Sequence, residues 1–176
     1  MTYDYVAQVP NGGCYPDLAF NRPATESSTY PTPVANGFVA ANAVDGHSYS
    51  LGSEANHTCT STDSNDLSPW WAVDLGKTTM VGYVFIRTRD NGTAVIRVGN
   101  GGDATSYLST NQAYTAPLID FSNGEIHFLV AVNAALVGRY VSVARPGGPQ
   151  LALCAVQVYG MYCLVLNIIG SAFYHC

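Results

Sequence analysis

The sequence predicts an all-β protein, built as an antiparallel β-sandwich or jelly roll. Short runs of β-branched and aromatic residues fill the middle of the chain, and clusters of Gly, Asn, Pro and Ser separate them. Helical spacing is scarce, and the exception, Ala40–Val44, ends at Asp45-Gly46 after one or two turns. Many short strands with regular turn signals between them are typical of sandwiches and jelly rolls.

Six segments carry the strand signal. The last of them alternates, so we expect Ala152, Cys154, Val156 and Val158 on one face, with that face buried and the other exposed. Trp70 and Trp71 are neighbours in another of these segments. Successive side chains of a strand point to opposite faces, so one of the two should face the core. The six expected strands are Trp70–Leu75, Val81–Thr88, Ala94–Val98, Ile126–Val132, Arg139–Ala144 and Leu151–Tyr159.

The length of 176 residues fits one domain with short extensions. Residues 1–13 carry Tyr, Pro and Gly and form an N-terminal arm, residues 14–163 form the sandwich, and residues 164–176 form an apolar C-terminal tail. The apolar run Leu164–Ile169 is too short to span a bilayer. It suits either a strand added to a sheet edge or the last strand of the same domain.

Charge and hydropathy argue against two kinds of interaction, nucleic-acid binding and a membrane span. Charged residues make up 11% of the chain, against about 25% in typical globular domains. The net charge is −5 and the chain has no basic run, which argues against nucleic-acid binding. No stretch of about 18 apolar residues exists, so we expect no membrane span. Uncharged polar side chains, attached sugars or neighbouring subunits should cover the surface instead.

The cysteines and two sequons predict a secreted glycoprotein. The five cysteines form no Cys-x-x-Cys pair and no zinc-type spacing, and wide spacing suits disulfides in an oxidising compartment. Asn56-His57-Thr58 and Asn91-Gly92-Thr93 are sequons, so we expect glycans on Asn56 and Asn91.

No catalytic arrangement is present in the sequence. Gly-x-Ser-x-Gly, His-Glu-x-x-His and a phosphate loop are all absent, and no spacing pairs two carboxylates as acid and base. Asp74 belongs to a strand, and His127 lies in an apolar strand as a packed or edge residue. The sequence therefore predicts a binding or assembly module and no enzyme.

Five segments, taken in order, resemble one family. Together they cover residues 18–160, and the set resembles the F-type lectins, the fucose-binding branch of the discoidin-like jelly rolls. The segments are Leu18–Ser28 (LAFNRPATESS), Ala41–Gly46 (ANAVDG), Pro69–Gly76 (PWWAVDLG), Gly138–Val143 (GRYVSV) and Leu151–Gly160 (LALCAVQVYG).

The resemblance implies a sandwich of about eight antiparallel strands with its termini together at one end. Loops at the opposite end would hold a calcium ion and a shallow sugar site. A disulfide between Cys59 and Cys154 is implied, and Cys14 and Cys163 are placed for a second bridge that closes the termini. Cys176 is then left for a bond to another chain.

The resemblance also implies a Ca²⁺ site, built from the hard oxygen ligands that this ion prefers. The site is expected to be weakened. Where the family adds a Glu after the closing cysteine, this chain has Ala155, so one anionic ligand is missing. Alternatively, Asp45-Gly46 is a simple turn with an Asx cap. The implied ligands are the carbonyls of Asn42, His47 and Cys154, the Asp45 carboxylate, and the carbonyl and hydroxyl of Thr58.

The sugar site implied by the resemblance departs from the family motif. Ser61 replaces the histidine of the Cys-Thr-His loop, Asp90 follows Arg89 without an intervening residue, and Arg97 lies one residue beyond the second basic position. The two arginines are alternatively ordinary strand-end residues, and His57 is alternatively only a sequon residue. A glycan on Asn91 would crowd the site. The implied sugar-binding residues are Arg89, Arg97, Asp90, Ser61 and His57.

Two functions follow from these features. The first is a secreted carbohydrate-binding module for fucosylated glycans with a degenerate sugar site. The second is a structural or self-assembling glycoprotein subunit of an extracellular fibre, coat or matrix. Its homo-oligomer would form through the N-terminal arm, the C-terminal tail or Cys176.

Overall fold

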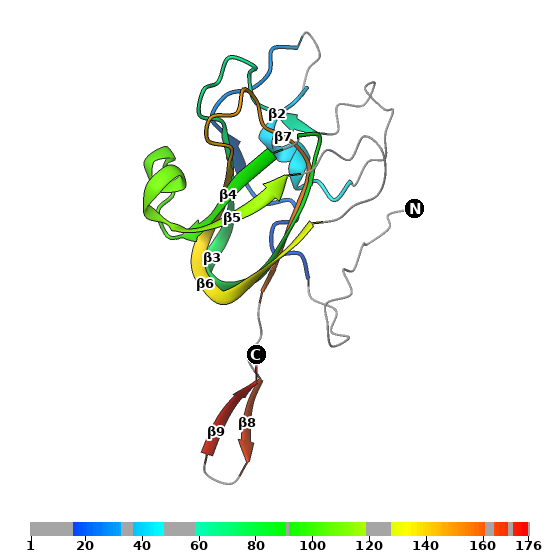
Figure 1. Ribbon diagram of the computed structural model, residues 1–176. Coiled ribbons are helices and arrows are strands. Elements are labelled where there is room, and N and C mark those ends of the chain that lie inside the picture. Colours follow the sequence, from blue (N-terminus) through cyan, green and yellow to red (C-terminus); the bar gives the residue numbers. More distant parts are fainter. Residues whose placement is uncertain are drawn as a thin grey trace.

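The structure, a computed structural model, describes residues 16–32, 37–47, 59–90, 92–118, 128–160, 164–168 and 171–175. Nearly all of the regular secondary structure in these ranges is strand, and the all-β prediction is confirmed (Figure 1). The strands are β1 (Ala24–Glu26), β2 (Thr60–Ser61), β3 (Trp70–Thr88), β4 (Gly92–Gly99), β5 (Gln112–Leu118), β6 (Phe128–Ala144), β7 (Ala152–Gly160), β8 (Leu164–Ile168) and β9 (Ser171–His175). Two short helices join them, η1 (Ala40–Ala43) and η3 (Ser106–Thr110).

Two long bent strands connect the two layers of the sandwich. β3 takes in the two expected strands between residues 70 and 88, and β6 takes in most of the two between 126 and 144. The beginning of β3 pairs with β1 and the end of β6, which gives one layer in the order β1-β3-β6-β4-β5. The end of β3 pairs with β7 and the beginning of β6, which gives the other layer, β2-β7-β3-β6. All of these pairings are antiparallel.

The bend in β3 and β6 is fastened by a turn and an ion pair. Gly76 has φ +81°, a backbone conformation that favours glycine, and its N–H donates to Asp74 Oδ1 over 2.8 Å. Arg139 donates from Nε and Nη2 to the two Asp74 oxygens, each over 2.7 Å. A Cβ on Gly138 would lie 2.3 Å from the backbone nitrogen of Gly99, so only glycine fits there. These contacts fix the point at which the strands pass from one layer to the other.

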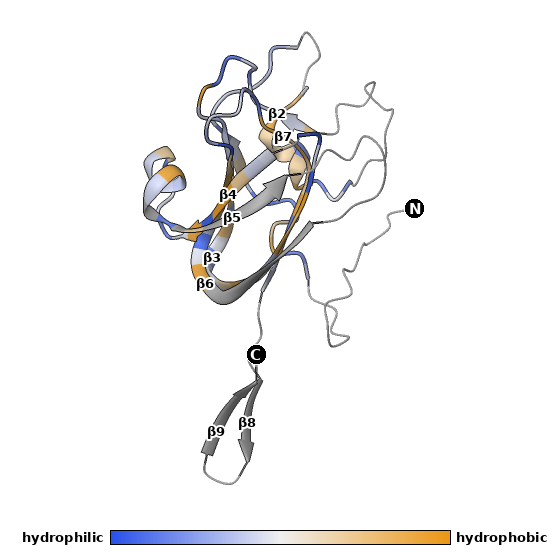
Figure 2. Cartoon of the chain, viewed as in Figure 1, coloured by the Kyte–Doolittle hydropathy of each residue, from blue (hydrophilic) through white to orange (hydrophobic). Residues whose placement is uncertain are grey.

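The hydrophobic core lies between the two layers and contains residues from both halves of β3. Trp71 is 0% exposed and donates from Nε1 to the Ala40 carbonyl oxygen over 2.9 Å, which ties η1 to the core. Figure 2 shows the hydrophilic residues gathered mainly in the loops. Other large, fully buried core side chains are Val73, Val81, Val84, Ile96, Val98, Val141, Val143, Leu151, Leu153, Val156 and Val158.

A bulge in β7 overturns the predicted alternation of that strand. Arg87 pairs with Ala155 and Thr88 pairs with Leu153, so Cys154 is an extra residue on the β7 side. An extra residue reverses which positions face inward. Leu153 and Val156 therefore both face the core, and the prediction that 152, 154, 156 and 158 share one face is wrong.

The predicted exposed face of β7 is also buried. Ala155 and Tyr159 pack with Phe85 in a second apolar cluster, and all three are buried. β7 pairs with β2 and β3, so it is a central strand of its layer. A central strand covered on both faces loses the apolar–polar alternation that a half-exposed strand shows.

The C-terminal strands form a sheet of their own. Within the ranges given above, β8 and β9 pair only with each other, and Figure 1 shows this hairpin apart from the sandwich. The tail is therefore neither an added edge strand nor a further strand of the main sheet there. Residues 1–13 lie outside the described residues, and no helix in the described part of the chain is long and apolar enough to cross a membrane.

Replacing Trp71 by Phe should lower the free energy of unfolding by about 1–3 kcal/mol, because the change leaves the buried Ala40 carbonyl without its donor and removes packed atoms. Trp70→Phe is the matched control, since Trp70 is half-buried and packs against the Tyr107 ring. Its loss should stay below about 1 kcal/mol. Urea denaturation of both variants measures the difference, and equal losses would contradict the assignment of Trp71 to the core.

Candidate functional site

The candidate site lies at one end of the sandwich, which we call the crown. The crown consists of residues 61–62 at the end of β2, residues 88–90 at the end of β3, and residues 145–152 between β6 and β7. The antiparallel pairing of β2 with β7 brings the first and last of these segments together, and the pairing of β3 with β7 brings the second and last together. Three segments far apart in the sequence therefore meet here.

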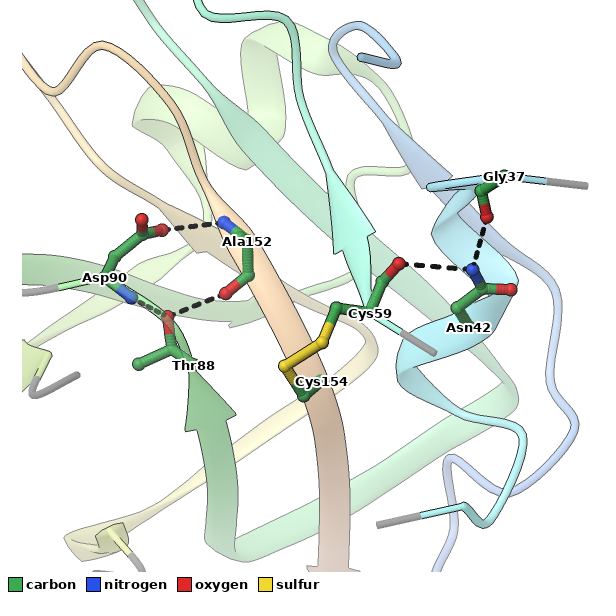
Figure 3. Close-up of a disulfide and its surroundings, with 7 residues drawn as sticks. All are labelled: Gly37, Asn42, Cys59, Thr88, Asp90, Ala152 and Cys154. Atoms are coloured by element: carbon green, nitrogen blue, oxygen red, sulfur yellow. Dashed lines mark hydrogen bonds between the residues drawn. A yellow bond between two sulfur atoms is a disulfide. The ribbon is translucent and has the colours of Figure 1, made fainter. Parts of the chain in front are cut away.

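A disulfide lies directly beneath the crown. Cys59 and Cys154 are joined, as the resemblance implies, and they continue the β2–β7 register by one residue (Figure 3). The two cysteines are 95 residues apart, so the bond should contribute about 4–5 kcal/mol in the chain-entropy account. Asn42 Nδ2 donates to the Cys59 carbonyl over 3.1 Å, which links η1 to the bond. Cys14, Cys163 and Cys176 lie outside the described residues.

Asp90 is bound to the first residue of β7. Its Oδ2 accepts from the Ala152 N–H over 2.6 Å, and its own N–H donates to Thr88 Oγ1 over 3.0 Å. The Thr88 hydroxyl donates in turn to the Ala152 carbonyl over 2.7 Å. Thr88 and Asp90 thus satisfy both backbone groups of Ala152, where the β7 ladder begins.

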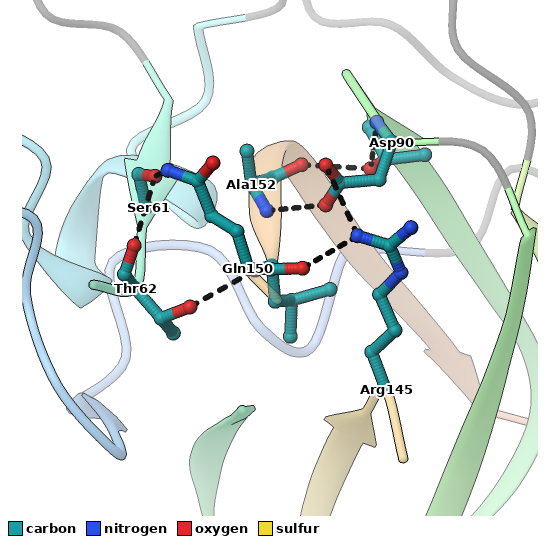
Figure 4. Close-up of polar contacts among 8 residues, drawn as sticks. Ser61, Thr62, Asp90, Arg145, Gln150 and Ala152 are labelled. Carbon is teal, nitrogen blue, oxygen red and sulfur yellow. Dashed lines mark hydrogen bonds and ion pairs between the residues drawn. The ribbon is translucent and has the colours of Figure 1, made fainter. Parts of the chain in front are cut away.

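Arg145 connects Asp90 to the rest of the crown (Figure 4). Its Nη1 lies 3.6 Å from Asp90 Oδ1 and donates to the Gln150 carbonyl over 2.7 Å. Gln150 Nε2 donates to Ser61 Oγ over 2.6 Å. The Arg145 and Asp90 side chains are only 17% and 13% exposed, so water screens this ion pair less than a surface pair.

Arg145 was not among the site residues predicted from the sequence. The residue directly follows the expected strand Arg139–Ala144 and precedes Pro146-Gly147-Gly148, a turn sequence. The sequence therefore shows a basic residue between the end of an expected strand and a turn. Its pairing with Asp90 was not predicted, because 55 positions separate the two residues and only the strand order β7-β3-β6 brings them together.

The structure brings together part of the predicted sugar site. Ser61 and Asp90 belong to one hydrogen-bonded network, and Arg89 is exposed beside Asp90 without a side-chain hydrogen bond or ion pair to a described residue. Arg97 lies apart from them, on β4, about 16 Å along the strand from Gly92 at the crown end. His57, with the sequon residues Asn56 and Asn91, lies outside the described ranges.

The predicted calcium ligands fall partly on one loop. Asn42, Asp45 and His47 follow one another in and after η1, which packs against β7, the strand that carries Cys154. Asp45 Oδ1 accepts from the His47 N–H over 2.8 Å, and Oδ2 lies 3.4 Å from His47 Nδ1. The Asx turn that the sequence offered as the alternative is therefore present.

Asp45 is the one carboxylate among the predicted ligands. Ala155 is buried where a second carboxylate would be needed, and among the described residues no group of three His, Cys, Asp or Glu side chains is placed to hold a metal ion. Main-chain oxygens would have to supply the other ligands, and Thr58 lies outside the described part of the chain. These residues fit a full calcium shell poorly, and calcium binding stays a prediction.

Two half-buried carboxylates lie away from the crown network. Burial raises the pKa of Glu26, although Thr60 and Thr29 hydroxyls donate to its two oxygens. Burial likewise raises the pKa of Asp17, which accepts from the Val158 N–H over 2.9 Å. Glu26 ties β1 to β2, and Asp17 ties the start of the described chain to β7.

A family profile described as a NedA-like, galactose-binding domain matches residues 42–143, more than half of the chain. The chain belongs to the NedA-like, galactose-binding domain family. The match takes in the end of η1, then β2, β3, β4, η3 and β5, and nearly all of β6. It therefore includes most of the core residues, but not those of β7, and two of the three crown segments.

Individual relatives indicate that, within this family, the chain is similar to the F-type lectins, as the sequence predicted. Fucolectin-4 of Anguilla japonica is 29% identical over 161 residues, which cover 86% of this chain and 84% of the fucolectin. A serum fucolectin of striped bass, Morone saxatilis, superposes with a TM-score of 0.67 at 28% identity over 85% of this chain. The chain spans 50% of that lectin's length.

A third relative was solved with a sugar. The lectin domain of lectinolysin, complexed with Lewis B antigen, superposes with a TM-score of 0.59 at 28% identity. The overlap covers 84% of this chain and 98% of the lectinolysin domain. The chain is thus an F-type lectin domain of the discoidin-like kind within its galactose-binding-like family, and the relatives found are lectins and binding modules.

The stability of this domain should depend on the ionisation of Glu26. The folded chain holds the Glu26 proton more tightly than the unfolded chain, because burial raises its pKa above the ordinary value of 4.5. The contribution of this group to the free energy of unfolding is therefore highest below pH 4.5 and falls as the pH rises through the folded pKa. Glu26→Gln should flatten that slope in urea denaturation between pH 4 and 8.

Asp66 provides a control, because its pKa is shifted in the direction opposite to that of Glu26. Burial acts to raise its pKa, but hydrogen bonds from Ser27 and Ser28 outweigh burial and lower it below 3.8. Its stabilising contribution is present above pH 3.8 and is lost as the pH falls, and Asp66→Asn should leave the slope between pH 4 and 8 unchanged. A Glu26→Gln chain with the wild-type slope would contradict the assignment.

Proposed function

We propose that this domain is a carbohydrate-binding lectin module whose ligand is a fucose-class saccharide held at the crown. The observation that carries the proposal is the crown network, in which Ser61 and Asp90 of the expected site join Arg145 and Gln150. Relatives named as fucolectins, and a relative complexed with Lewis B antigen, support the fucose class.

The crown offers the chemistry that sugar hydroxyls need. A hydroxyl accepts hydrogen bonds from a guanidinium group, which the exposed Arg89 presents to solvent. A hydroxyl also donates to a carboxylate, and Asp90 supplies a carboxylate at the crown directly beside Arg89. Arg145 holds Asp90 in place, so a sugar would meet a group that is already oriented.

The proposed site is weaker than one with all of the family's groups. A serine hydroxyl stands at position 61 in place of an imidazole, and it already accepts from Gln150. Arg145 and Asp90 have internal partners, so a bound sugar competes with existing hydrogen bonds. We therefore expect affinity in the millimolar to high micromolar range, and we propose a secreted domain because it carries a disulfide and two sequons.

Arg89→Ala should reduce affinity for a fucose-terminated glycan about tenfold or more, since a hydrogen bond to a charged group contributes about 1.5–3 kcal/mol. Isothermal titration with Lewis B tetrasaccharide, in buffers with calcium and with EDTA, measures the change. Lys77→Ala is the matched control, because it removes one exposed positive charge beside Gly76 at the bend. Lys77→Ala should bind like the wild type.

Two results would count against this proposal. Absence of saturable binding to any fucosylated glycan contradicts the lectin function. Binding that Arg89→Ala and Arg145→Met both leave unchanged contradicts the crown as its location. Binding that is equal in calcium and in EDTA would show that the residues of the Asp45 loop act as a turn and not as a cation site.

A second candidate function is self-assembly, which the C-terminal hairpin favours. Each strand of the β8–β9 sheet has one edge without a strand partner among the described residues. Such edges can pair with another chain. Deleting residues 164–176, which keeps Cys163, should then abolish concentration-dependent polymers in sedimentation velocity, and unchanged polymers or a monomeric full chain would contradict this role.

A further inference from the structure

The side chain of Gln150 holds the hydroxyl of Ser61, a residue of the predicted sugar site (Figure 4). Gln150 Nε2 donates to Ser61 Oγ over 2.6 Å, and Ser61 is only 5% exposed. The Ser61 hydroxyl donates in turn to the Thr62 carbonyl over 3.3 Å, so it receives the amide N–H as an acceptor. The Gln150 amide therefore makes the contact that a saccharide hydroxyl would have to make with this buried serine.

The backbone of Ser61 is already paired on both sides. Its N–H donates to the Phe38 carbonyl over 3.0 Å, and its carbonyl accepts from the Tyr30 N–H over 2.8 Å. The β2–β7 register, in which Ser61 lies opposite Ala152, also holds the serine in place. Its hydroxyl is therefore the group of Ser61 that can change partners when a ligand arrives.

The main chain at Gln150 is fixed independently of the side chain. The Gln150 carbonyl accepts from Arg145 Nη1 over 2.7 Å. The next residue, Leu151, donates from its N–H to the Thr62 hydroxyl over 2.9 Å and accepts from the Thr62 N–H over 3.0 Å. Gln150 itself is half-buried, so rotation about its side-chain bonds can release Ser61 while the backbone stays in place.

Ser61 and Asp90 lie on opposite sides of the first residue of β7. Ala152 pairs with Ser61 of β2 on one side and accepts and donates hydrogen bonds at the end of β3 on the other. Strands that flank a central strand lie about 10 Å apart. A saccharide that binds Asp90 and also reaches Ser61 must therefore take the place of the Gln150 amide.

We propose that Gln150 sets the saccharide affinity of the crown by competing with the ligand for Ser61. This inference rests on the lectin function proposed above. The exchange conserves hydrogen bonds, because a saccharide hydroxyl donates to Ser61 Oγ in place of the amide N–H. The ligand gains only the difference between two similar hydrogen bonds, and it first has to displace the closed side chain.

Isothermal titration of the full chain with Lewis B tetrasaccharide tests the competition. Gln150→Ala should bind about three- to tenfold more tightly than the wild type, because a neutral hydrogen bond no longer holds the closed state. Gln150→Met keeps the length of the side chain and removes the donor, and it should also bind more tightly. A residue with only a supporting role would give the opposite sign, since its loss would weaken binding.

Gln157→Ala is the matched control. It removes a half-buried glutamine side chain further along β7, where Gln157 accepts from the Tyr159 hydroxyl over 3.0 Å, and it should bind like the wild type. Ser61→Ala tests the coupling, because the competition needs the serine hydroxyl. In that background, Gln150→Ala should change the affinity by less than about twofold.

Three outcomes overturn the proposal. One is wild-type binding that Gln150→Ala and Gln150→Met leave unchanged or weaken, which leaves the lectin function standing. Another is a gain in affinity that persists in the Ser61→Ala background, since the side chain would then only obstruct the crown. The last is absence of binding by the wild type and by both Gln150 variants, which contradicts the lectin function as well.

Discussion

The fold depends on one bent antiparallel pair, β3 and β6. Register shifts between Asp74 and Thr79 let each strand serve both layers, so Trp71 and Val84 of one strand enter the same core from opposite sides. The turn at Gly76 and the bidentate Asp74–Arg139 pair fix where the strands cross. An exposed pair of this kind contributes little to stability by itself. Its effect is to set the position at which the register changes.

The Cys154 bulge also sets the position of a register change, at the crown end of the molecule. It reverses the inward-facing positions of β7, so that Leu153 and Val156 both reach the core. Ala152 then begins the strand at the crown, where its N–H and carbonyl bind Asp90 and Thr88. Cys154, two residues beyond Ala152, forms the disulfide to Cys59. Core packing and crown geometry are therefore consequences of a single extra residue.

The few charged residues of this chain have distinct environments. Asp74 and Arg139 pair at the surface, and Asp90 and Arg145 pair where water is largely excluded. Arg97 is half-buried, and its Nε and Nη1 atoms are buried without a hydrogen-bond partner among the described residues. A protein with 11% charged residues has few ways to compensate such a group internally.

The sequence alone determined the fold class, most strand positions and the family, because turn residues, β-branched runs and the segments PWWAVDLG and LALCAVQVYG are local signals. It also marked Ser61 and Asp90, which the crown brings together. Only the tertiary structure decided that Arg145 and not Arg89 pairs with Asp90, that Arg97 is remote from the crown, and that β7 is buried on both faces. These outcomes depend on pairing between strands distant in the chain and on a bulge that shifts register, and neither leaves a periodic trace in the sequence.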